Sequence, residues 1–236
     1  MKRPATLIGV ALGAVLVLGL AAVLIGSLSR PSAAPRDVTG PVDGVRAASF
    51  ELLDGATSVR VRASSLGDDL YRVSVPSDAG IRPRVDRDGG DVRLRLVPFG
   101  DGGGSGVVDV VVNTSVTWSL RMTGGARETR IDMSGATTDQ IFLAGGASLI
   151  DVALARPSRS VAVAMTGGVD QFRVRLPSGT PVRVTASSGA GSVTIAGQAH
   201  QGVAGGQSFT ANGWTDGAPG VDVQARAGAG VVIVDA

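Results

Sequence analysis

Apolar and polar residues alternate with a period of two along most of the chain from Phe50 onwards. Clear examples are 59–62 (Val-Arg-Val-Arg), 92–96 (Val-Arg-Leu-Arg-Leu) and 172–176 (Phe-Arg-Val-Arg-Leu). Successive residues of a strand point to opposite faces, so this alternation indicates strands with one buried face. Outside residues 5–28 no segment shows the period of an amphipathic helix. The pattern predicts an all-β domain.

A glycine doublet precedes the alternating segments of the C-terminal half at a nearly constant interval. A sequence period of about 20–50 residues is typical of stacked repeats. The first glycines are 21, 22, 22 and 39 positions apart, and the last interval equals one period plus 17 residues. The doublets are Gly124-Gly125, Gly145-Gly146 and Gly167-Gly168, followed by the weaker forms Gly189-Ala190-Gly191 and Gly228-Ala229-Gly230.

Each period holds two alternating segments, so one repeat is a coil of two strands. The sequence therefore predicts a β-solenoid of two facing sheets, built from coils of about 22 residues over 49–236, with an insertion at about 198–219. Glycine suits the corner of a coil either because the backbone needs a positive φ or because stacked coils leave no room for a Cβ atom. The final strand, at 231–234, is expected at an edge of the stack.

The first 28 residues have a different pattern. Residues 5–28 are uncharged and mostly aliphatic, and a helix of this length spans about 36 Å, more than a hydrocarbon core of about 30 Å. A cleaved signal peptide is the alternative, although its apolar segment is usually about 7–15 residues long. We favour an uncleaved signal anchor at 5–28, with a cytoplasmic segment at 1–4 and a linker rich in Pro, Ser and Ala at 29–48. The expected location is the cell membrane, with a single pass, a cytoplasmic N-terminus and an extracytoplasmic C-terminal domain.

Composition argues against several functional classes. The chain has no cysteine, one histidine and a formal net charge of +2. Without cysteine there is no disulfide, thiolate metal site or cysteine nucleophile, and the small net charge argues against nucleic acid as a partner. His200 falls in the insertion without a Gly-x-Ser-x-Gly motif, so we expect a solvated loop residue. We therefore expect no enzymatic activity, no metal and no cofactor.

Two patterns leave room for other chemistry. Asp132 and Asp151 are expected at equivalent positions of successive coils, about 5 Å apart, the spacing of a retaining carbohydrate-enzyme pair. The favoured interpretation is a solvated or ion-paired outer face. The glycine-rich segment 100–106 is similar to calcium-binding repeats, but it occurs once, which favours a flexible loop.

Arginine supplies the remaining candidate site. Seven arginines alternate with core residues and are expected to project outwards, where aligned coils would form a stripe. Such a stripe could bind the phosphate or carboxylate groups of anionic envelope polymers or lipid headgroups. The alternative is an ordinary soluble face that the aspartates of the chain neutralise. The seven residues are Arg60, Arg62, Arg93, Arg95, Arg173, Arg175 and Arg183.

The motifs of the repeats resemble those of a known family. They are Gly-Gly-Ala-Arg-Glu-Thr-Arg-Ile-Asp-Met-Ser-Gly at 124–135, Gly-Gly-Ala-Ser-Leu-Ile-Asp-Val-Ala-Leu at 145–154 and Leu-Pro-Ser-Gly-Thr-Pro-Val-Arg-Val at 176–184, with Trp214 in the insertion. They are similar to bacterial β-solenoid proteins labelled "putative adhesin" or toast-rack-like, of the membrane-tethered actinobacterial type. The resemblance covers residues 50–236. It implies a cell-envelope location and, for some relatives, a link to envelope-stress signalling, and it transfers no catalytic residue.

The expected function is that of a non-enzymatic, membrane-anchored envelope protein that presents a β-solenoid for binding or scaffolding. Its expected partners are the membrane and envelope proteins or anionic envelope polymers. The alternative is a regulatory or sensing partner of an envelope-stress system. An envelope polysaccharide-active enzyme is a more distant alternative.

Overall fold

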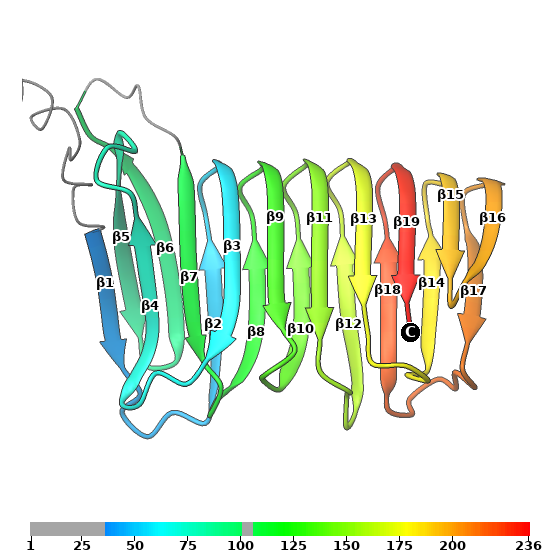
Figure 1. The fold of residues 1–236 in the computed structure, drawn as a ribbon, viewed down its shortest axis with the longest axis horizontal. Helices are drawn as coiled ribbons and strands as arrows, with labels where there is room; N and C mark the ends of the chain where they lie inside the picture. The colour runs from blue at the N-terminus through cyan, green and yellow to red at the C-terminus, as the bar shows by residue number, and fades with distance from the viewer. Residues whose placement is uncertain (1–35, 101–105) are drawn as a thin grey trace, which may run out of the picture. The chain divides into compact units, whose positions relative to one another are not determined.

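The computed structural model describes residues 36–100 and 106–236, which form two β-sheets that face each other (Figure 1). Within these residues there is no helix. The alternation seen in the sequence is the burial pattern of the strands, since Val92 and Leu94 are buried while Arg93 and Arg95 are exposed. The all-β, two-sheet fold is confirmed.

The membrane helix expected at 5–28 lies outside the described residues. Among residues 36–100 and 106–236, no helix is long and apolar enough to cross a bilayer.

The strands divide into a ten-stranded and a nine-stranded sheet. The ten-stranded sheet contains, in spatial order, β1 (Arg36–Pro41), β4 (Asp69–Val75), β7 (Val107–Asn113), β3 (Ala56–Ser64), β9 (Ala126–Met133), β11 (Ala147–Leu154), β13 (Val169–Arg175), β19 (Ala229–Asp235), β15 (Ala190–Ile195) and β16 (Gln198–Val203). The nine-stranded sheet contains β17 (Gln207–Ala211), β14 (Val182–Ala186), β18 (Gly220–Ala225), β12 (Ser160–Met165), β10 (Thr138–Leu143), β8 (Thr117–Met122), β2 (Ala47–Leu52), β6 (Asp91–Pro98) and β5 (Ile81–Asp88).

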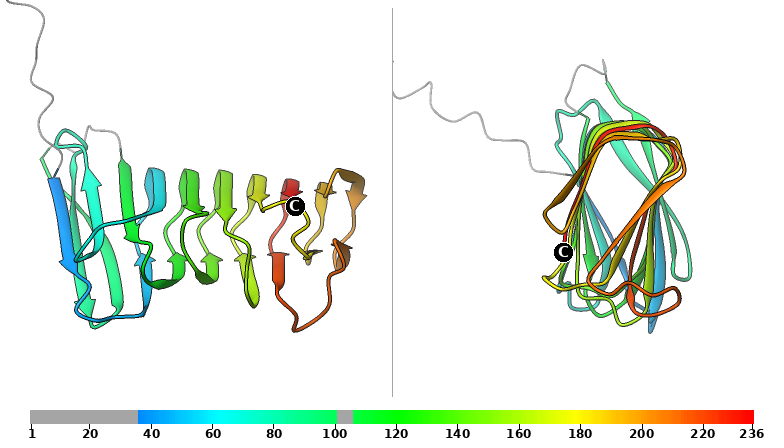
Figure 2. Two further views of the ribbon diagram at one scale, coloured as in Figure 1. Left: turned by 60° about the horizontal axis from the view of Figure 1, so that its bottom comes forward. Right: turned by 90° about the vertical axis from the view of Figure 1, so that its right-hand side faces the viewer.

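Each coil consists of one strand of the nine-stranded sheet and the following strand of the ten-stranded sheet. In the middle of the stack the coils β8–β9, β10–β11 and β12–β13 follow one another with parallel neighbours. Ile150 of β11, for example, lies between Thr129 of β9 and Phe172 of β13. The end-on view shows the coils superposed around one core (Figure 2). This is the solenoid that the glycine period predicted.

Two coils are stacked out of chain order. β18–β19, the last coil in the sequence, lies between β12–β13 and β14–β15 (Figure 1). In the same way β2–β3 lies between β6–β7 and β8–β9. The prediction that the final strand forms an edge is wrong, because β19 pairs with β13 on one side and β15 on the other.

Antiparallel strands close the stack at both ends. At the β16 end, β16 pairs with β15 and β17 pairs with β14. At the β5 end, β4 and β1 extend the ten-stranded sheet and β5 extends the nine-stranded sheet. The segment predicted as an insertion at 198–219 thus supplies both closing strands of the β16 end.

The boundary between linker and domain is earlier than predicted. β1 and the beginning of β2 lie within the linker expected at 29–48, so the solenoid domain begins at residue 36 rather than 49. β1 has little apolar alternation of its own, and it is held by antiparallel pairing with β4. The structure therefore limits any linker to residues before 36.

The glycine corners are required by close approach of the backbones. A Cβ atom at the first glycine of a doublet would lie 2.1 Å from Asp54 of the preceding coil at Gly124, 2.3 Å from Gly124 at Gly145, and 2.4 Å from Gly145 at Gly167. Real Cβ atoms do not approach backbone so closely. Of the ten corner glycines, only Gly189 has a positive φ, of 87°. Close approach therefore accounts for the first glycines of these three doublets, and a positive φ occurs at one of the ten corner positions.

The remaining corner glycines differ in how tightly they are enclosed. A Cβ would meet backbone at 2.6 Å at Gly191 and 2.5 Å at Gly230, and at 3.1–3.2 Å at Gly125 and Gly146. At Gly168 the nearest atom is 3.8 Å away, an ordinary contact, and at Gly228 there is none within 4 Å.

The core between the sheets is mainly aliphatic, with four aromatic side chains, of which Tyr71 keeps a small exposed part. Phe50, Trp118 and Phe172 are fully buried. Burial of an indole N–H without a partner would be unfavourable, and the Trp118 Nε1–H donates a hydrogen bond to the Asn113 carbonyl at 2.8 Å.

Candidate functional site

The seven candidate arginines do not form one stripe. Arg60 and Arg62 on β3 and Arg173 and Arg175 on β13 belong to the ten-stranded sheet, whereas Arg93 and Arg95 on β6 and Arg183 on β14 belong to the nine-stranded sheet. The two groups therefore lie on opposite faces of the molecule, and each must be considered by itself.

On the ten-stranded sheet, carboxylates from neighbouring strands neutralise the arginines. Such exposed pairs contribute little stability, but they reduce the charge available to a ligand. Arg62 makes no ion pair among the described residues, yet it stands beside Asp132 in register. The ion pairs, with their N–O distances, are Arg60–Asp109 (3.8 Å), Arg173–Asp235 (3.9 Å) and Arg175–Asp151 (3.0 Å).

The outer face of the β5–β6 hairpin is different. Arg84 of β5 lies directly opposite Arg95 of β6, and like charges in directly opposed positions destabilise a sheet. Arg84 has one ion pair, with Asp86 at 3.8 Å. Neither Arg93 nor Arg95 has one among the described residues, although Arg93 lies in register with Asp86 on one side and Glu51 on the other. We call Arg82, Arg84, Arg93 and Arg95 the β5–β6 arginine face.

Exposed apolar side chains adjoin this face. Val97 lies opposite Arg82 in register and is 44% exposed, and Phe99 is 39% exposed. The Arg82 guanidinium lies 3.1 Å from the centre of the Phe99 ring. Arginines beside an exposed ring are a combination that suits an anionic, partly apolar surface.

The sequence pattern anticipated half of this face. Arg93 and Arg95 were predicted from the alternation in β6. Arg82 and Arg84 alternate in the same way with Ile81 and Pro83, so the signal was present in β5. The exposure of Phe99 could not be read from the sequence.

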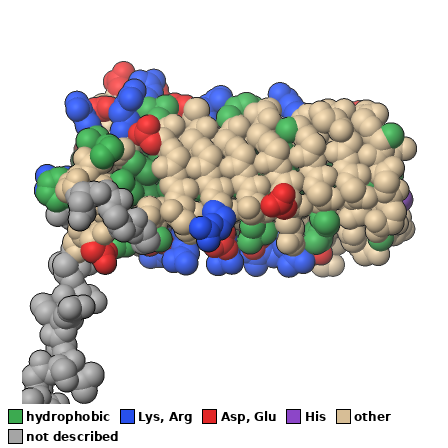
Figure 3. Space-filling view, turned by 90° about the horizontal axis from the view of Figure 1, so that it is seen from above, with side chains coloured by type: hydrophobic (Ala, Val, Ile, Leu, Met, Phe, Trp, Pro, Cys, Tyr) green, Lys and Arg blue, Asp and Glu red, His purple; other side chains and the backbone are tan. Residues whose placement is uncertain are grey.

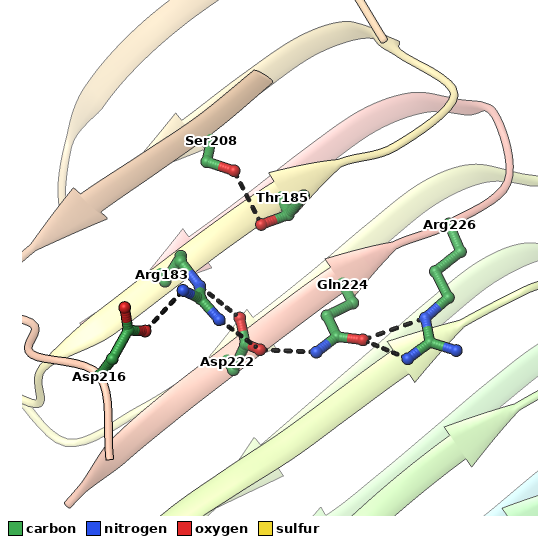
Figure 4. Close-up of polar contacts among 7 residues, drawn as sticks. All are labelled: Arg183, Thr185, Ser208, Asp216, Asp222, Gln224 and Arg226. Carbon is green, nitrogen blue, oxygen red and sulfur yellow. Dashed lines mark hydrogen bonds and ion pairs between the residues drawn. The ribbon is translucent and has the colours of Figure 1, made fainter. Parts of the chain in front are cut away.

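Arg183 belongs to a separate polar network on the nine-stranded sheet (Figure 4). Its guanidinium donates to both carboxylate oxygens of Asp222 at 3.0 Å and to Asp216 at 2.6 Å. Gln224 Nε2 donates to Asp222 at 2.6 Å, and Arg226 donates in turn to Gln224 Oε1. The guanidinium of Arg183 is therefore already occupied by carboxylates of the same chain. The network joins β14 to β18 and to the turn before β18.

Asp222 remains charged in this network. Burial alone would raise its pKa, but the hydrogen bonds from Arg183 and Gln224 and the charges of Arg183 and Arg226 outweigh burial, so its pKa lies below the usual value. The same hydrogen bond raises the pKa of Arg183. The network is a structural clamp between two coils and offers no free acid or base.

Asp222→Ala is expected to lower the free energy of unfolding at pH 7 by about 2 kcal/mol, because it removes charged hydrogen bonds at a side chain only 10% exposed. Asp216→Ala, at a position 79% exposed, is the matched control and should cost less than about 0.5 kcal/mol. Urea unfolding of both variants measures the difference. The lowered pKa means that the Asp222 contribution exists above about pH 4 and is lost as the pH falls through the folded-state value. Equal losses of unfolding free energy in the two variants would contradict the conclusion that Asp222 joins the two coils.

The carboxylate ladder is not formed. Asp132 lies beside Ala153, whereas Asp151 lies between Arg130 and Arg173, two residues away in register. Their expected equivalence is wrong because they stand eight and six residues after their glycine doublets. Among the described residues there is no cluster of three or more His, Asp or Glu side chains that could hold a metal ion.

A cavity of about 280 Å³ lies at the corners opposite the glycine doublets, between the turns at 134–138 and 154–159. Its lining contains no carboxylate and no histidine. Arg156 donates to the Ser178 carbonyl and Arg159 pairs with Asp139 at 3.1 Å. This cavity therefore lacks the two carboxylates that a carbohydrate enzyme requires. Residues 101–105 of the calcium-loop candidate lie outside the described residues.

The single histidine is part of a closing strand. His200 lies on β16, and its ring stacks on Phe209 of β17 with centroids 4.1 Å apart. Both side chains are half-buried, and they cover the core at the β16 end. The prediction of a solvated loop histidine is wrong, because the insertion folds back as strands.

The structure defines a two-sheet β-solenoid closed at both ends by antiparallel strands. A solved structure of the same fold is a protein described as a putative cell adhesion protein from Clostridium sporogenes, with a TM-score of 0.59 and 16% identity over 86% of this chain and 100% of that one. At this identity the likeness shows the fold alone, and it confirms the fold that the family resemblance implied.

Two more distant structures are described as putative adhesins. The protein from Bacteroides fragilis has a TM-score of 0.27 and 10% identity over 86% of this chain and 98% of that one. The protein from Parabacteroides distasonis has a TM-score of 0.22 and 11% identity over 85% and 97%. No family model and no curated protein matches the sequence.

Proposed function

We infer that this protein is a non-enzymatic, single-pass membrane protein whose extracytoplasmic β-solenoid binds phosphate-bearing anionic groups of the envelope. The observation that carries the inference is the β5–β6 arginine face. It brings Arg84 and Arg95 into direct opposition and leaves Arg95 without an ion pair among the described residues, whereas Arg60, Arg175 and Arg183 each have a carboxylate partner.

Retention of an opposed arginine pair is a cost to the folded state. Arg84 and Arg95 repel each other across the hairpin, and neither is needed to fill the core because both side chains are exposed. A bound anion between two guanidinium groups turns the repulsion into charge-assisted hydrogen bonds. Features that oppose local stability are expected where a protein binds something.

The β5–β6 arginine face lies at one end of the stack. β1, the first described strand, and β5 close the same end of the stack. Lipid headgroups and phosphate-linked wall polymers share the chemistry that this face recognises.

Binding is tested with residues 36–236, which contain the whole described core, and vesicles of phosphatidylglycerol or phosphatidylcholine. Arg84→Gln/Arg95→Gln is expected to weaken binding to phosphatidylglycerol about tenfold or more. Arg60→Gln/Arg175→Gln removes the same charge from the opposite sheet and is the control, with less than about a twofold effect expected. A soluble glycerol-phosphate polymer in place of vesicles distinguishes a wall polymer from a lipid surface. Equal losses in the two double variants, or no binding to either anion, would remove the proposal.

A further inference from the structure

The outermost strands of the β16 end lack the features that normally protect a sheet edge. Among the described residues β16 pairs only with β15 and β17 only with β14, so each leaves one row of backbone N–H and C=O groups unpaired. Between Arg183 and Asp216 the sequence contains no Asp, Glu, Lys, Arg or Pro. Unprotected edges of this kind pair with another chain.

The β5 end has the protection that the β16 end lacks. β5 contains Pro83 and five charged residues in a strand of eight. β1 contains Asp37 and Pro41, and its register with β4 is irregular at Gly40. Viewed from above, charged side chains crowd the end formed by β1, β5 and β6, whereas the end formed by β15 and β16 shows almost none (Figure 3). Because both ends belong to one chain, overall composition does not explain the difference.

The core behind the two open edges is already covered. His200 and Phe209 stack at an angle of 22° between the sheets. The β16 end therefore presents backbone edges rather than an exposed apolar core, and its natural partner is another strand.

We propose that the β16 end pairs with the β16 end of a second copy of this chain. A twofold axis perpendicular to both sheets sets β16 antiparallel to the same strand of the second copy, and β17 antiparallel to its own counterpart. Both sheets then continue from one copy into the other, and the unpaired backbone groups of both edges are satisfied together.

Two features of the end select a second copy over a single foreign strand. The free edges belong to two different sheets, about 10 Å apart, so one added strand satisfies only one of them. A second copy presents two edges with the same separation. The charge-free surface also meets its own copy without repulsion, which the β5 end would not.

The contact is small, with edges of six and five residues, so the pairing is reversible and depends on concentration. It places the two β1 strands at opposite ends of the joined molecule. Adhesion between two envelope surfaces follows if each copy is anchored, and that consequence alone rests on the proposed function. The pairing needs neither the anchor nor the arginine face.

The test uses the full chain in detergent micelles. The chain has no native cysteine, so any disulfide that forms joins introduced cysteines. Rotation about this axis leaves the core-facing side of each sheet facing the core in both copies. In each of the two strand pairs, one residue must therefore lie directly opposite the same residue of the second copy. Opposed Cα atoms about 4.5–5.5 Å apart suit a disulfide. Single cysteines are placed along β16 at Gln198, Ala199 and Gln201 and along β17 at Ser208 and Thr210, with Arg84→Cys and Asp86→Cys on β5 as controls.

Oxidation is expected to give disulfide-linked dimers at one position of β16 and one position of β17, and none at the β5 controls. Sedimentation of the cysteine-free chain should show a dimer that Gln201→Lys/Thr210→Lys abolishes, while Thr39→Lys on β1 leaves it unchanged. A chain that stays monomeric across the concentration series overturns the proposal, as does equal crosslinking at both ends. Crosslinking through only one of the two strands overturns the two-sheet arrangement.

Discussion

Gly145→Ala is expected to lower the free energy of unfolding by about 3 kcal/mol, the upper end of what overpacking usually costs. The new Cβ would lie 2.3 Å from the carbonyl oxygen and 2.4 Å from the carbonyl carbon of Gly124, and 2.5 Å from the backbone nitrogen of Gly125. These atoms belong to the neighbouring coil and cannot rotate away as a side chain would. Relief of the clash requires the corners of β8–β9 and β10–β11 to move apart, which strains their parallel hydrogen bonds.

Gly228→Ala is the matched control for this substitution. Gly228 occupies the corner of β18–β19, yet a Cβ there meets no atom within 4 Å, and its φ is not positive. Alanine also reduces the conformational freedom of the unfolded chain, so we expect no loss and a gain of up to about 0.5 kcal/mol. Guanidinium unfolding of both variants, followed by circular dichroism, gives the comparison. Equal effects at the two corners would show that the glycines serve chain flexibility rather than close stacking.

The architecture of a single coil could be predicted because its causes are local. Alternation of Val92 to Leu96 reports one buried face, and the interval between Gly124 and Gly145 reports the length of one turn of the stack. Both signals depend on neighbouring residues and on a period, which a sequence displays directly.

The spatial order of the coils could not be predicted in this way. All of the parallel strands have a similar alternation of buried apolar residues, so the sequence does not tell beside which neighbour Val223 of β18 packs. Insertion of β18–β19 between β12–β13 and β14–β15 depends on the path of residues 196–219, which first close the β16 end and then return. The same limit applied to Asp132 and Asp151, whose register depends on how each corner is built rather than on sequence spacing.

The sequence was enough to predict outward-facing arginines as the candidate site, but not where in the fold those arginines would lie together. Outward arginines follow from alternation, but neutralisation of Arg60 by Asp109 joins strands β3 and β7, which are distant in sequence. The opposed pair Arg84 and Arg95 likewise becomes visible only with the register of the hairpin. Charge balance on a solenoid surface is a property of neighbouring coils, so the stacking order has to be known first.

Deletion of residues 220–236 is expected to release the β16 end from the rest of the domain. β14 pairs only with β17 and β18, and β15 pairs only with β16 and β19. Without β18 and β19, strands β14 to β17 have no hydrogen-bonded connection to β12 or β13. The deleted coil also carries four fully buried valines, Val221, Val223, Val232 and Val234.

This deletion should lower the free energy of unfolding by more than the substitutions at Gly145 and Asp222. Burial of each valine stabilises the fold by about 1.5 kcal/mol, so four amount to about 6 kcal/mol, comparable to a typical total stability of about 5–15 kcal/mol. Limited proteolysis with mass spectrometry is expected to show cleavage within 178–219 while residues 36–175 resist longer. The uncovered edges of β12 and β13 should also promote aggregation.

Complementation distinguishes a missing coil from general damage. A peptide of residues 220–236, added to the shortened chain, is expected to restore protease resistance to 182–211, because it supplies both strands between their existing neighbours. The same peptide with Val223→Asp should fail, since a carboxylate would enter a fully buried position. Undiminished protection of 182–211 without any peptide would mean that the β16 end holds to the core through contacts other than β18 and β19. Because β18 and β19 follow β17 in the sequence but lie between β12–β13 and β14–β15 in space, the β16 end is expected to become stable only once residues 220–236 are available.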